Sequence, residues 1–180
     1  GQRSEHALST VAPILNDASI ACVLFPRPLL EEEKSKSHSK KKSAVVVDYA
    51  HTPDALKKSL QTLAKQFNKK VDVVFGCGGD RDRGKRYKMG KIANQFASKI
   101  YLTNDNPRSE NPNSIIKQIK KGCSRSKIIL DRKIAIKTAI NNLNNDSILL
   151  IAGKGHENYQ IINNQKKYFS DQKVSKFFLK

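Results

Sequence analysis

Acidic residues are scarce in this 180-residue chain, which has 34 Lys and Arg against 16 Asp and Glu and a formal net charge of +18 at pH 7. Such an imbalance can indicate a protein that binds nucleic acid or another anionic surface. The lysines, however, are scattered along predicted helix faces among many Asn and Ile residues, which favours solvated faces. We therefore expect no dedicated nucleic-acid surface, and nucleic-acid binding stays the less favoured alternative.

The chain also has no run of 18 apolar residues, so its sequence predicts no membrane-spanning helix. Its first residues lack the charged-then-apolar order of a signal peptide. Cys22, Cys77 and Cys123 are odd in number and show no paired metal-ligand spacing. We therefore expect a cytoplasmic protein without metal ligands of its own.

Composition divides the chain into three segments. Residues 1–30 predict a short helix and then a strand over 20–25, which Pro26 ends. Residues 31–43 combine three acids with a basic run and low hydrophobicity, which is typical of a charged, flexible linker. Residues 44–180 are long enough for one domain with a real core.

Strand and helix patterns alternate throughout residues 44–180. Continuous apolar runs predict buried strands at 44–49, 71–75, 99–103, 127–130 and 147–152. Helical spacing of apolar residues follows each of the first four. Together they predict an α/β, Rossmann-like fold, in which a mostly parallel sheet carries helices on both faces.

Near the end of the chain, the pattern changes to two short strand-like segments. Residues 159–162 and 167–169 predict a hairpin that turns at Asn163 and Asn164. A last helix is expected after Ser170 and Asp171. Earlier in the chain, Gly122 is expected to cap the C-terminal end of the helix that bears Ile115, Ile116 and Ile119.

Charged residues gather in the loops that follow four of the predicted strands. The right-handed crossover rule places all four loops at one edge of the sheet, where open α/β sheets bind ligands. The residues in question are Asp48, His51, Asp80, Arg81, Asp82, Arg83, Arg108, Lys154, His156 and Glu157. Taken singly, each loop could be only a capped or glycine-rich turn, and His51 alone is more typical of a capping or packing residue.

The tetrapeptide Asp105–Arg108 directly follows one of these strands. Pro107 disfavours helical conformation at Asn106, so Arg108 is presented at the carboxyl end of a strand. A guanidinium there suits bidentate capture of a carboxylate, although a capped loop with a solvated arginine is the alternative.

The glycine-rich loop at 76–84 lets the backbone approach a ligand closely and offers amide donors together with Arg81 and Lys85. It is not a Walker loop, because the pattern Gly-x-x-x-x-Gly-Lys-[Ser/Thr] occurs nowhere in the chain.

Four motifs together resemble the C-terminal domain of the Mur ligases, in order and at family spacing over residues 43 to about 176. They are Asp48-Tyr49-Ala50-His51-Thr52-Pro53-Asp54-Ala55-Leu56, Phe75-Gly76-Cys77-Gly78-Gly79-Asp80-Arg81-Asp82, Asp105-Asn106-Pro107-Arg108-Ser109-Glu110-Asn111-Pro112 and Ala152-Gly153-Lys154-Gly155-His156-Glu157. The resemblance implies a Rossmann-like third domain that brings an incoming amino acid to an acyl phosphate made in a central ATPase domain.

Within that family, the tetrapeptide Asp-Asn-Pro-Arg marks selection of meso-diaminopimelate, and lysine-adding members carry another tetrapeptide. The resemblance therefore implies a meso-diaminopimelate site formed by Arg81, Asp105, Asn106, Pro107, Arg108, Gly153 and Glu157. It further implies that Asp48, His51 and Lys85 face nucleotide or Mg²⁺ at the central domain. No side chain of this chain is expected to be a covalent catalyst.

ATP, Mg²⁺ and the UDP-linked dipeptide are expected to bind through a central domain, which in this family supplies the P-loop. Because the chain contains no Walker pattern, we do not expect activity from it alone. Residues 1–24 faintly resemble the end of the family's N-terminal domain, and an unrelated leader is an equal alternative. A non-catalytic remnant or binding module of the same fold is the main alternative to a ligase domain.

Overall fold

The computed structural model describes residues 23–26 and 43–179. The helix predicted near residues 11–15 and the linker predicted at 31–43, except its last residue, lie outside the described residues.

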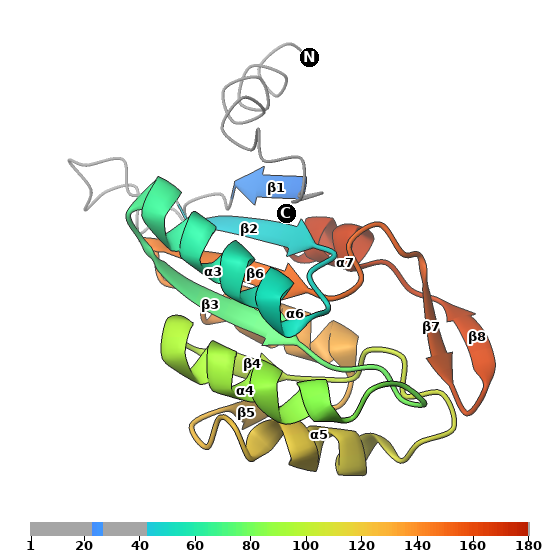
Figure 1. Cartoon of the computed structure of the whole chain (residues 1–180). Coiled ribbons are helices and arrows are strands. Elements are labelled where there is room, and N and C mark those ends of the chain that lie inside the picture. Colours follow the sequence, from blue (N-terminus) through green and yellow to red (C-terminus); the bar gives the residue numbers. More distant parts are fainter. Residues whose placement is uncertain (1–22, 27–42, 180) are drawn as a thin grey trace.

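A six-stranded sheet forms the centre of the fold (Figure 1), with the strand order β1-β2-β6-β3-β4-β5. The strands are β1 Val23–Pro26, β2 Ala44–Asp48, β3 Lys70–Phe75, β4 Ile100–Leu102, β5 Lys127–Ile128 and β6 Ser147–Ala152. Strands β2 to β6 are mutually parallel, and β1 pairs antiparallel with β2. The prediction of a mostly parallel, Rossmann-like sheet is therefore confirmed.

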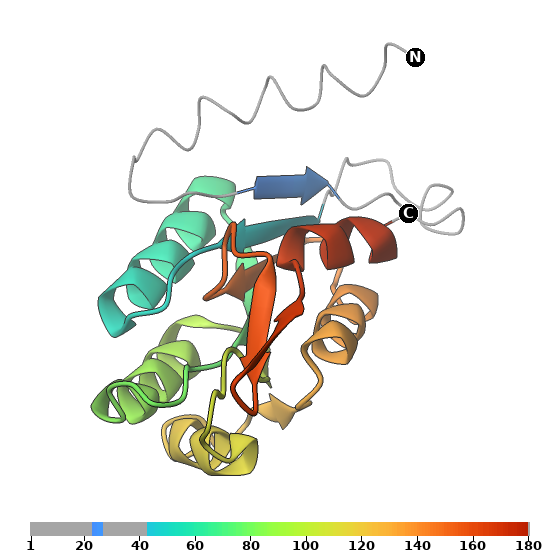
Figure 2. The same ribbon diagram turned by 90° about the vertical axis from the view of Figure 1, so that its right-hand side faces the viewer.

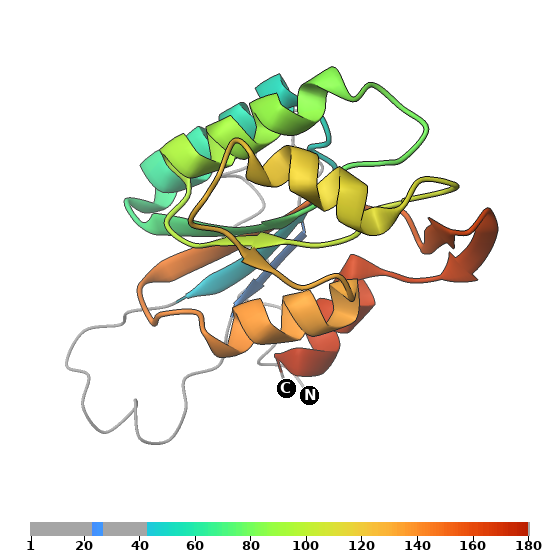
Figure 3. The same cartoon turned by 90° about the horizontal axis from the view of Figure 1, so that it is seen from below.

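Helices cover both faces of this sheet (Figure 3). On one face lie α3 Pro53–Phe67, α4 Gly84–Phe96 and α5 Pro112–Lys120, and on the other lie α6 Arg132–Asn141 and α7 Asp171–Phe178. Successive strand residues alternate between the two layers: Val46 packs with α3 to α5, while Val45 and Val47 pack with α6 and α7. Both layers are apolar, which explains why the strands read as continuous hydrophobic runs.

The chain order places β6 in the middle of the sheet, between β2 and β3. Strands β2, β3, β4 and β5 are connected by α3, α4 and α5 on one face, and α6 on the other face returns the chain to β6. The direction of winding thus reverses beside β6, which is the position where open α/β sheets form ligand crevices.

The predicted hairpin is confirmed as β7 Tyr159–Ile162 and β8 Gln165–Tyr168, and it projects beyond the carboxyl ends of the parallel strands (Figures 1 and 2). Asn163 and Asn164 have φ values of 50° and 58°, so both occupy the left-handed conformation of a two-residue hairpin turn. Strand β8 begins two residues earlier than predicted.

Two sequence predictions need correction. Strand β5 ends at Ile128 and not at Leu130, because the chain turns at Asp131 to cap α6 through Ile134 N–H. Gly122 is not the C-cap of α5; that position is Lys121. A Cβ on Gly122 would lie 2.4 Å from Tyr87 O, so this glycine instead permits close packing of α5 against α4.

Candidate functional site

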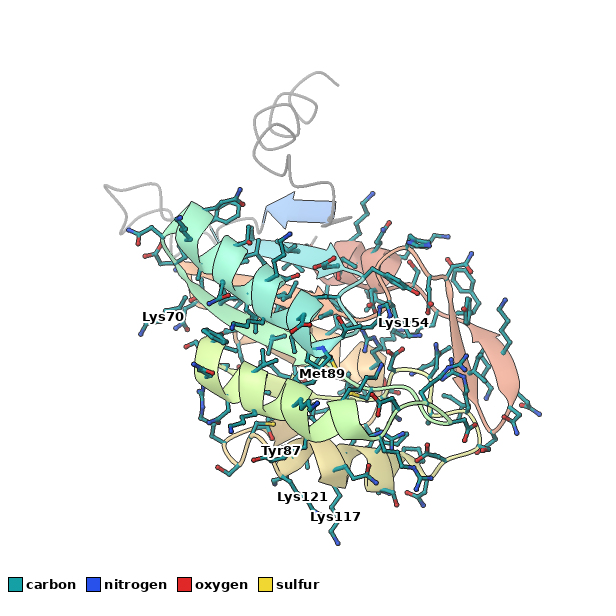
Figure 4. The ribbon with its side chains drawn as sticks, viewed as in Figure 1. Lys70, Tyr87, Met89, Lys117, Lys121 and Lys154 are labelled. Carbon is teal, nitrogen blue, oxygen red and sulfur yellow. The ribbon has the colours of Figure 1, made fainter. Side chains whose placement is uncertain are left out.

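Four loops meet at the carboxyl edge of the sheet, as the sequence predicts, because β2, β3, β4 and β6 are parallel. Figure 4 shows Lys154, which follows β6, at this edge, whereas Lys70, which begins β3, lies at the opposite end of the sheet. The hairpin adds a fifth element, since Arg108 N–H donates to Ile161 O at 3.0 Å.

The loops after β3 and β4 pack backbone against backbone. A Cβ on Gly76 would lie 2.1 Å from Thr103 O, and one on Gly79 would lie 1.9 Å from Pro107 O. Gly79 N–H also donates to Asn106 O at 2.8 Å. Only glycine fits at these two positions, so the glycine-rich loop serves as a platform for the tetrapeptide.

Arg108 is half-buried on this platform with φ of 53°, a left-handed conformation that is uncommon for a residue with a side chain. Its Nη1 donates to Gly79 O at 2.8 Å and lies 3.4 Å from Asn106 O. Arg81 is exposed and lies across the same loop: its Cγ and Arg108 Nη1 are 3.7 and 2.9 Å from the point where a Cβ on Gly78 would lie. The two predicted arginines thus flank Gly78.

A buried arginine that sequence reasoning missed holds the two loops together. Arg86 is fully buried, and its guanidinium donates to both carboxylate oxygens of Glu110 at 2.8 and 2.9 Å and to Gly78 O at 3.0 Å. The hydrogen bonds from Arg86 lower the pKa of Glu110 to about 2. In sequence, Arg86 is one cation in a basic helix, and nothing local distinguishes it.

Asp80, in the same loop, has φ of 52° and binds the residues that follow the tetrapeptide. Its N–H donates to Glu110 Oε1 at 2.7 Å, and its carboxylate accepts from Ser109 Oγ at 2.8 Å and from Ser109 N–H at 3.1 Å. The hydrogen bonds from Ser109 lower the pKa of Asp80. Asp80 therefore fixes the loop that carries Arg108, and its own carboxylate is already occupied.

Lys154 connects the remaining predicted residues. Its side chain is fully buried, and Nζ donates to Asn106 Oδ1 at 2.8 Å and to Tyr159 O at 2.9 Å. The same ammonium forms ion pairs with Asp105 Oδ1 at 3.1 Å and Glu157 Oε2 at 3.6 Å. The sequence favoured ligand contact for the loop that carries Lys154, whereas the structure buries its ammonium among groups of the protein.

Gly153 and Pro107 contribute backbone to this arrangement. Gly153 has φ of 118°, and a Cβ there would lie 3.2 Å from Asp105 Oδ2, so any side chain would be strained and crowded. Pro107 is buried, and its carbonyl lies against Gly79. Of the seven residues predicted for the amino-acid site, six lie in this contact network, and Arg81 lies beside it across Gly78.

The three residues predicted to face nucleotide differ in their surroundings. Asp48 is buried, and its carboxylate accepts from Ser59 Oγ at 2.6 Å and Tyr49 N–H at 2.7 Å; burial raises its pKa. His51 Nδ1 lies 2.8 Å from Tyr49 O, and Lys85 Nζ donates to His51 O at 3.0 Å. Asp48 thus holds the loop after β2 from its buried side, and His51 and Lys85 are partly exposed to solvent.

Within residues 23–26 and 43–179, no group of three His, Cys, Asp or Glu residues is arranged to hold a metal ion. No helix among these residues is both long and apolar enough to cross a membrane.

A family model described as "Mur ligase, glutamate ligase domain" matches residues 35–155. The chain belongs to the Mur ligase family. It is 50% identical over 146 residues to the UDP-N-acetylmuramoyl-L-alanyl-D-glutamate–2,6-diaminopimelate ligase of Buchnera aphidicola subsp. Baizongia pistaciae, covering 79% of this chain and 29% of that ligase. The ligase of the same name from Haemophilus ducreyi is 48% identical over 143 residues, or 78% of this chain and 28% of the relative.

Solved structures agree with this assignment. A UDP-N-acetylmuramoyl-L-alanyl-D-glutamate–2,6-diaminopimelate ligase superposes with a TM-score of 0.76 at 38% identity, covering 96% of this chain and 34% of that one. A folylpolyglutamate synthase from Yersinia pestis, 19% identical with a TM-score of 0.52, shares the fold alone. The predicted resemblance to the Mur ligase C-terminal domain of the diaminopimelate-adding type is therefore confirmed, and the chain spans roughly three-tenths of the length of these curated Mur ligases.

Proposed function

We propose that this domain binds meso-diaminopimelate and presents it to an ATP-dependent ligation that extends UDP-N-acetylmuramoyl-L-Ala-D-Glu in peptidoglycan synthesis. The names of its relatives support this substrate, and the Mur ligase family is ATP-dependent. The complete reaction is proposed for the domain acting together with a central ATPase domain.

One observation carries the proposal: the site has a cationic pole and an acidic pole on neighbouring loops. Arg108 and Arg81 flank Gly78 at one side, and Glu157 and Asp105 pair with Lys154 at the other. Asn106 joins the poles, because its carbonyl lies by Arg108 and its side chain accepts from Lys154. Diaminopimelate carries a distal carboxylate and a distal ammonium on one carbon, which such a pair of poles would bind.

L-Lysine differs from diaminopimelate because it has no distal carboxylate. A site that presents arginine to a carboxylate would lose the charge-assisted bonds with lysine and leave a guanidinium unpaired. We therefore assign the discrimination between the two amino acids to Arg108 and Arg81, which would bind the distal carboxylate. Glu157 would bind the distal ammonium.

In the complete ligase, ATP phosphorylates the D-glutamyl carboxylate, and the amine of diaminopimelate attacks the acyl phosphate to give a tetrahedral intermediate. The domain contributes positioning of the amine, which replaces a bimolecular encounter by a fixed geometry. His51, on the loop anchored by Asp48, and Lys85, in the first turn of α4, are proposed with Asp48 to face the nucleotide and its Mg²⁺ at the central domain.

Calorimetric titration tests the proposal. We expect the domain to bind meso-diaminopimelate and not L-lysine, and Arg108→Met to weaken binding by about 100-fold, as expected for the loss of charge-assisted hydrogen bonds. Lys117→Met, which removes an exposed cation from α5 away from these loops, is the control and should bind as the unmodified protein does. Equal affinity for both amino acids would overturn the assignment.

A non-catalytic binding module of the same fold is the alternative to a ligase domain. It predicts intact meso-diaminopimelate binding but no ATP hydrolysis or ligation when the central domain of a relative is added. The net charge of +18 raises nucleic-acid binding as a further class, which predicts affinity for DNA or RNA that falls steeply with salt. Weak binding to DNA or RNA that does not change with salt concentration would exclude a nucleic-acid-binding function.

A further inference from the structure

Lys154 is unusual because its side chain is fully buried although it lies at the centre of the proposed ligand site. Burial of an ammonium is unfavourable unless its charge is balanced and its protons find acceptors. Two acceptors come from different elements: Asn106 Oδ1 in the loop after β4, and Tyr159 O at the start of β7. Two carboxylates, Asp105 and Glu157, balance the charge.

Asn106 shows what this arrangement does. Its Oδ1 accepts two hydrogen bonds, from Lys154 Nζ at 2.8 Å and from Ile161 N–H at 3.0 Å. Two donors on one side of a carboxamide fix its orientation, because exchanging the oxygen for the NH₂ group would place donors against donors. Its Nδ2 is thereby turned away from both donors, and the hydrogen bonds found for this side chain among the described residues all go to Oδ1.

The backbone of Asn106 is held equally firmly. Its carbonyl accepts from Gly79 N–H at 2.8 Å, and the preceding carbonyl, of Asp105, accepts from Gln160 Nε2 at 2.7 Å. Because these two contacts fix the backbone, the main freedom left to the Asn106 side chain is the choice between its two amide orientations. Lys154 and Ile161 N–H decide that choice.

Charge gives Lys154 a second effect. The ammonium with Asp105 and Glu157 forms a group with two carboxylates and one cation, so one net negative charge remains. Glu157 is the carboxylate farther from Nζ, at 3.6 Å without a hydrogen bond, and is therefore free to bind a ligand ammonium. Asp105 Oδ1 is buried without another partner, so it depends on Lys154 for compensation.

We infer that Lys154 is a positioning residue that sets the stereochemical selectivity of the site: it turns the Asn106 amide donor toward the ligand and leaves Glu157 for the ligand ammonium. This inference rests on the proposed function. The meso and LL isomers of diaminopimelate exchange the positions of carboxylate and ammonium at one carbon, so a fixed donor beside a fixed acceptor distinguishes them.

The experiment uses two variants, Lys154→Met and Lys154→Met/Asp105→Asn. The double variant removes one positive and one negative charge, so the net charge of the buried group is the same as in the unmodified protein. Lys167→Met, on the exposed strand β8, is the matched control. We measure the side-chain amide signals of Asn106 in ¹⁵N-labelled protein, assigned with Asn106→Ser, and the affinities for meso- and LL-diaminopimelate by calorimetry.

We compare the double variant with Asp105→Asn alone, because Asp105 is itself part of the acidic pole. Relative to that single variant, we expect the Asn106 amide signals to shift or broaden in the folded double variant, and the preference for the meso isomer to fall about tenfold, with both unchanged in Lys167→Met. A purely structural role would lower both affinities together and leave their ratio unchanged, which would overturn the inference. Unchanged Asn106 signals in a folded variant would overturn it as well. If the unmodified protein binds neither isomer, the proposed function fails, while the amide signals still decide whether Lys154 orients Asn106.

Discussion

At the scale of single residues, the loops at the carboxyl edge of the sheet are held by buried cations. Arg86, Arg132 and Lys154 are fully buried, and each pairs with a carboxylate from a distant part of the chain. Arg132 in α6, for example, donates through Nε and Nη2 to Asp171 in α7 at 2.8 Å each and also to Ala152 O at the end of β6. A buried pair is costly to break from one side, so these contacts fix the loops strongly.

The first prediction concerns Glu110→Gln, which leaves the buried Arg86 guanidinium without a counter-charge. We expect a loss of about 3 kcal/mol in the free energy of unfolding near pH 7, at the low end for a buried pair because the Glu110 side chain is 12% exposed. Urea denaturation of both proteins measures it. A loss below about 1 kcal/mol would mean that the pair contributes little.

The same substitution predicts a pH dependence. Because the pKa of Glu110 is lowered from 4.5 to about 2, its stabilisation is fully present above pH 4.5 and is lost as the pH falls toward 2. The stability difference between the unmodified protein and Glu110→Gln should therefore be constant from pH 7 to 5 and shrink between pH 4.5 and 2. A difference that does not vary with pH would contradict this assignment.

At the scale of elements, loops from separate strands pack as closely as core segments do. The glycine-rich loop after β3 and the tetrapeptide loop after β4 touch through backbone atoms at Gly76 and Gly79. The hairpin then covers the tetrapeptide loop through Gln160 and Ile161. The geometry of the site is thus a property of three packed segments and not of one motif.

Gly79→Ala tests this packing, because the added Cβ would lie 1.9 Å from Pro107 O, a backbone atom that cannot move alone. We expect a destabilisation of about 3 kcal/mol, typical of severe overpacking, together with weakened meso-diaminopimelate binding. Gly84→Ala is the control: its Cβ would meet only the Asp82 side chain at 3.1 Å. Thermal unfolding and calorimetry measure both, and equal effects from the two substitutions would contradict the packing argument.

At the scale of the whole molecule, β1 completes the sheet along β2. The antiparallel pairing runs from Val23 opposite Val47 to Pro26 opposite Ala44, so it covers most of the length of β2. Strand β2 is buried throughout and apolar except for Asp48. An apolar strand left at an open edge would be a template for pairing with another chain.

A chain that begins at Ser43 therefore should associate, because it retains β2 and lacks β1. The net positive charge opposes association at low salt, so we expect light scattering to show it above about 0.3 M salt, where charge repulsion is screened. A chain that begins at Ala21 keeps β1 and is the control. Monomeric behaviour of both chains at high salt would show that β1 does not protect this edge.

Local sequence determined the elements of this domain. The continuous apolar runs of β2, β3 and β6 and the Asn163–Asn164 turn depend on neighbouring residues, and both were predictable. The shared edge of the four loops followed from parallel strand direction alone. The length of β5 was misjudged, because the chain turns at Asp131 to cap α6, and Gly122 follows the C-cap of α5 instead of forming it.

The tertiary structure decided which of these residues touch. The last parallel strand, β6, enters the sheet between β2 and β3, and this insertion brings Lys154 to Asp105 and Asn106, almost 50 positions earlier in the chain. The Arg86–Glu110 pair likewise depends on the packing of two loops. Periodicity and caps record interactions between neighbours in sequence, whereas contacts between loops depend on strand order and on backbone clearance, which only the folded chain establishes.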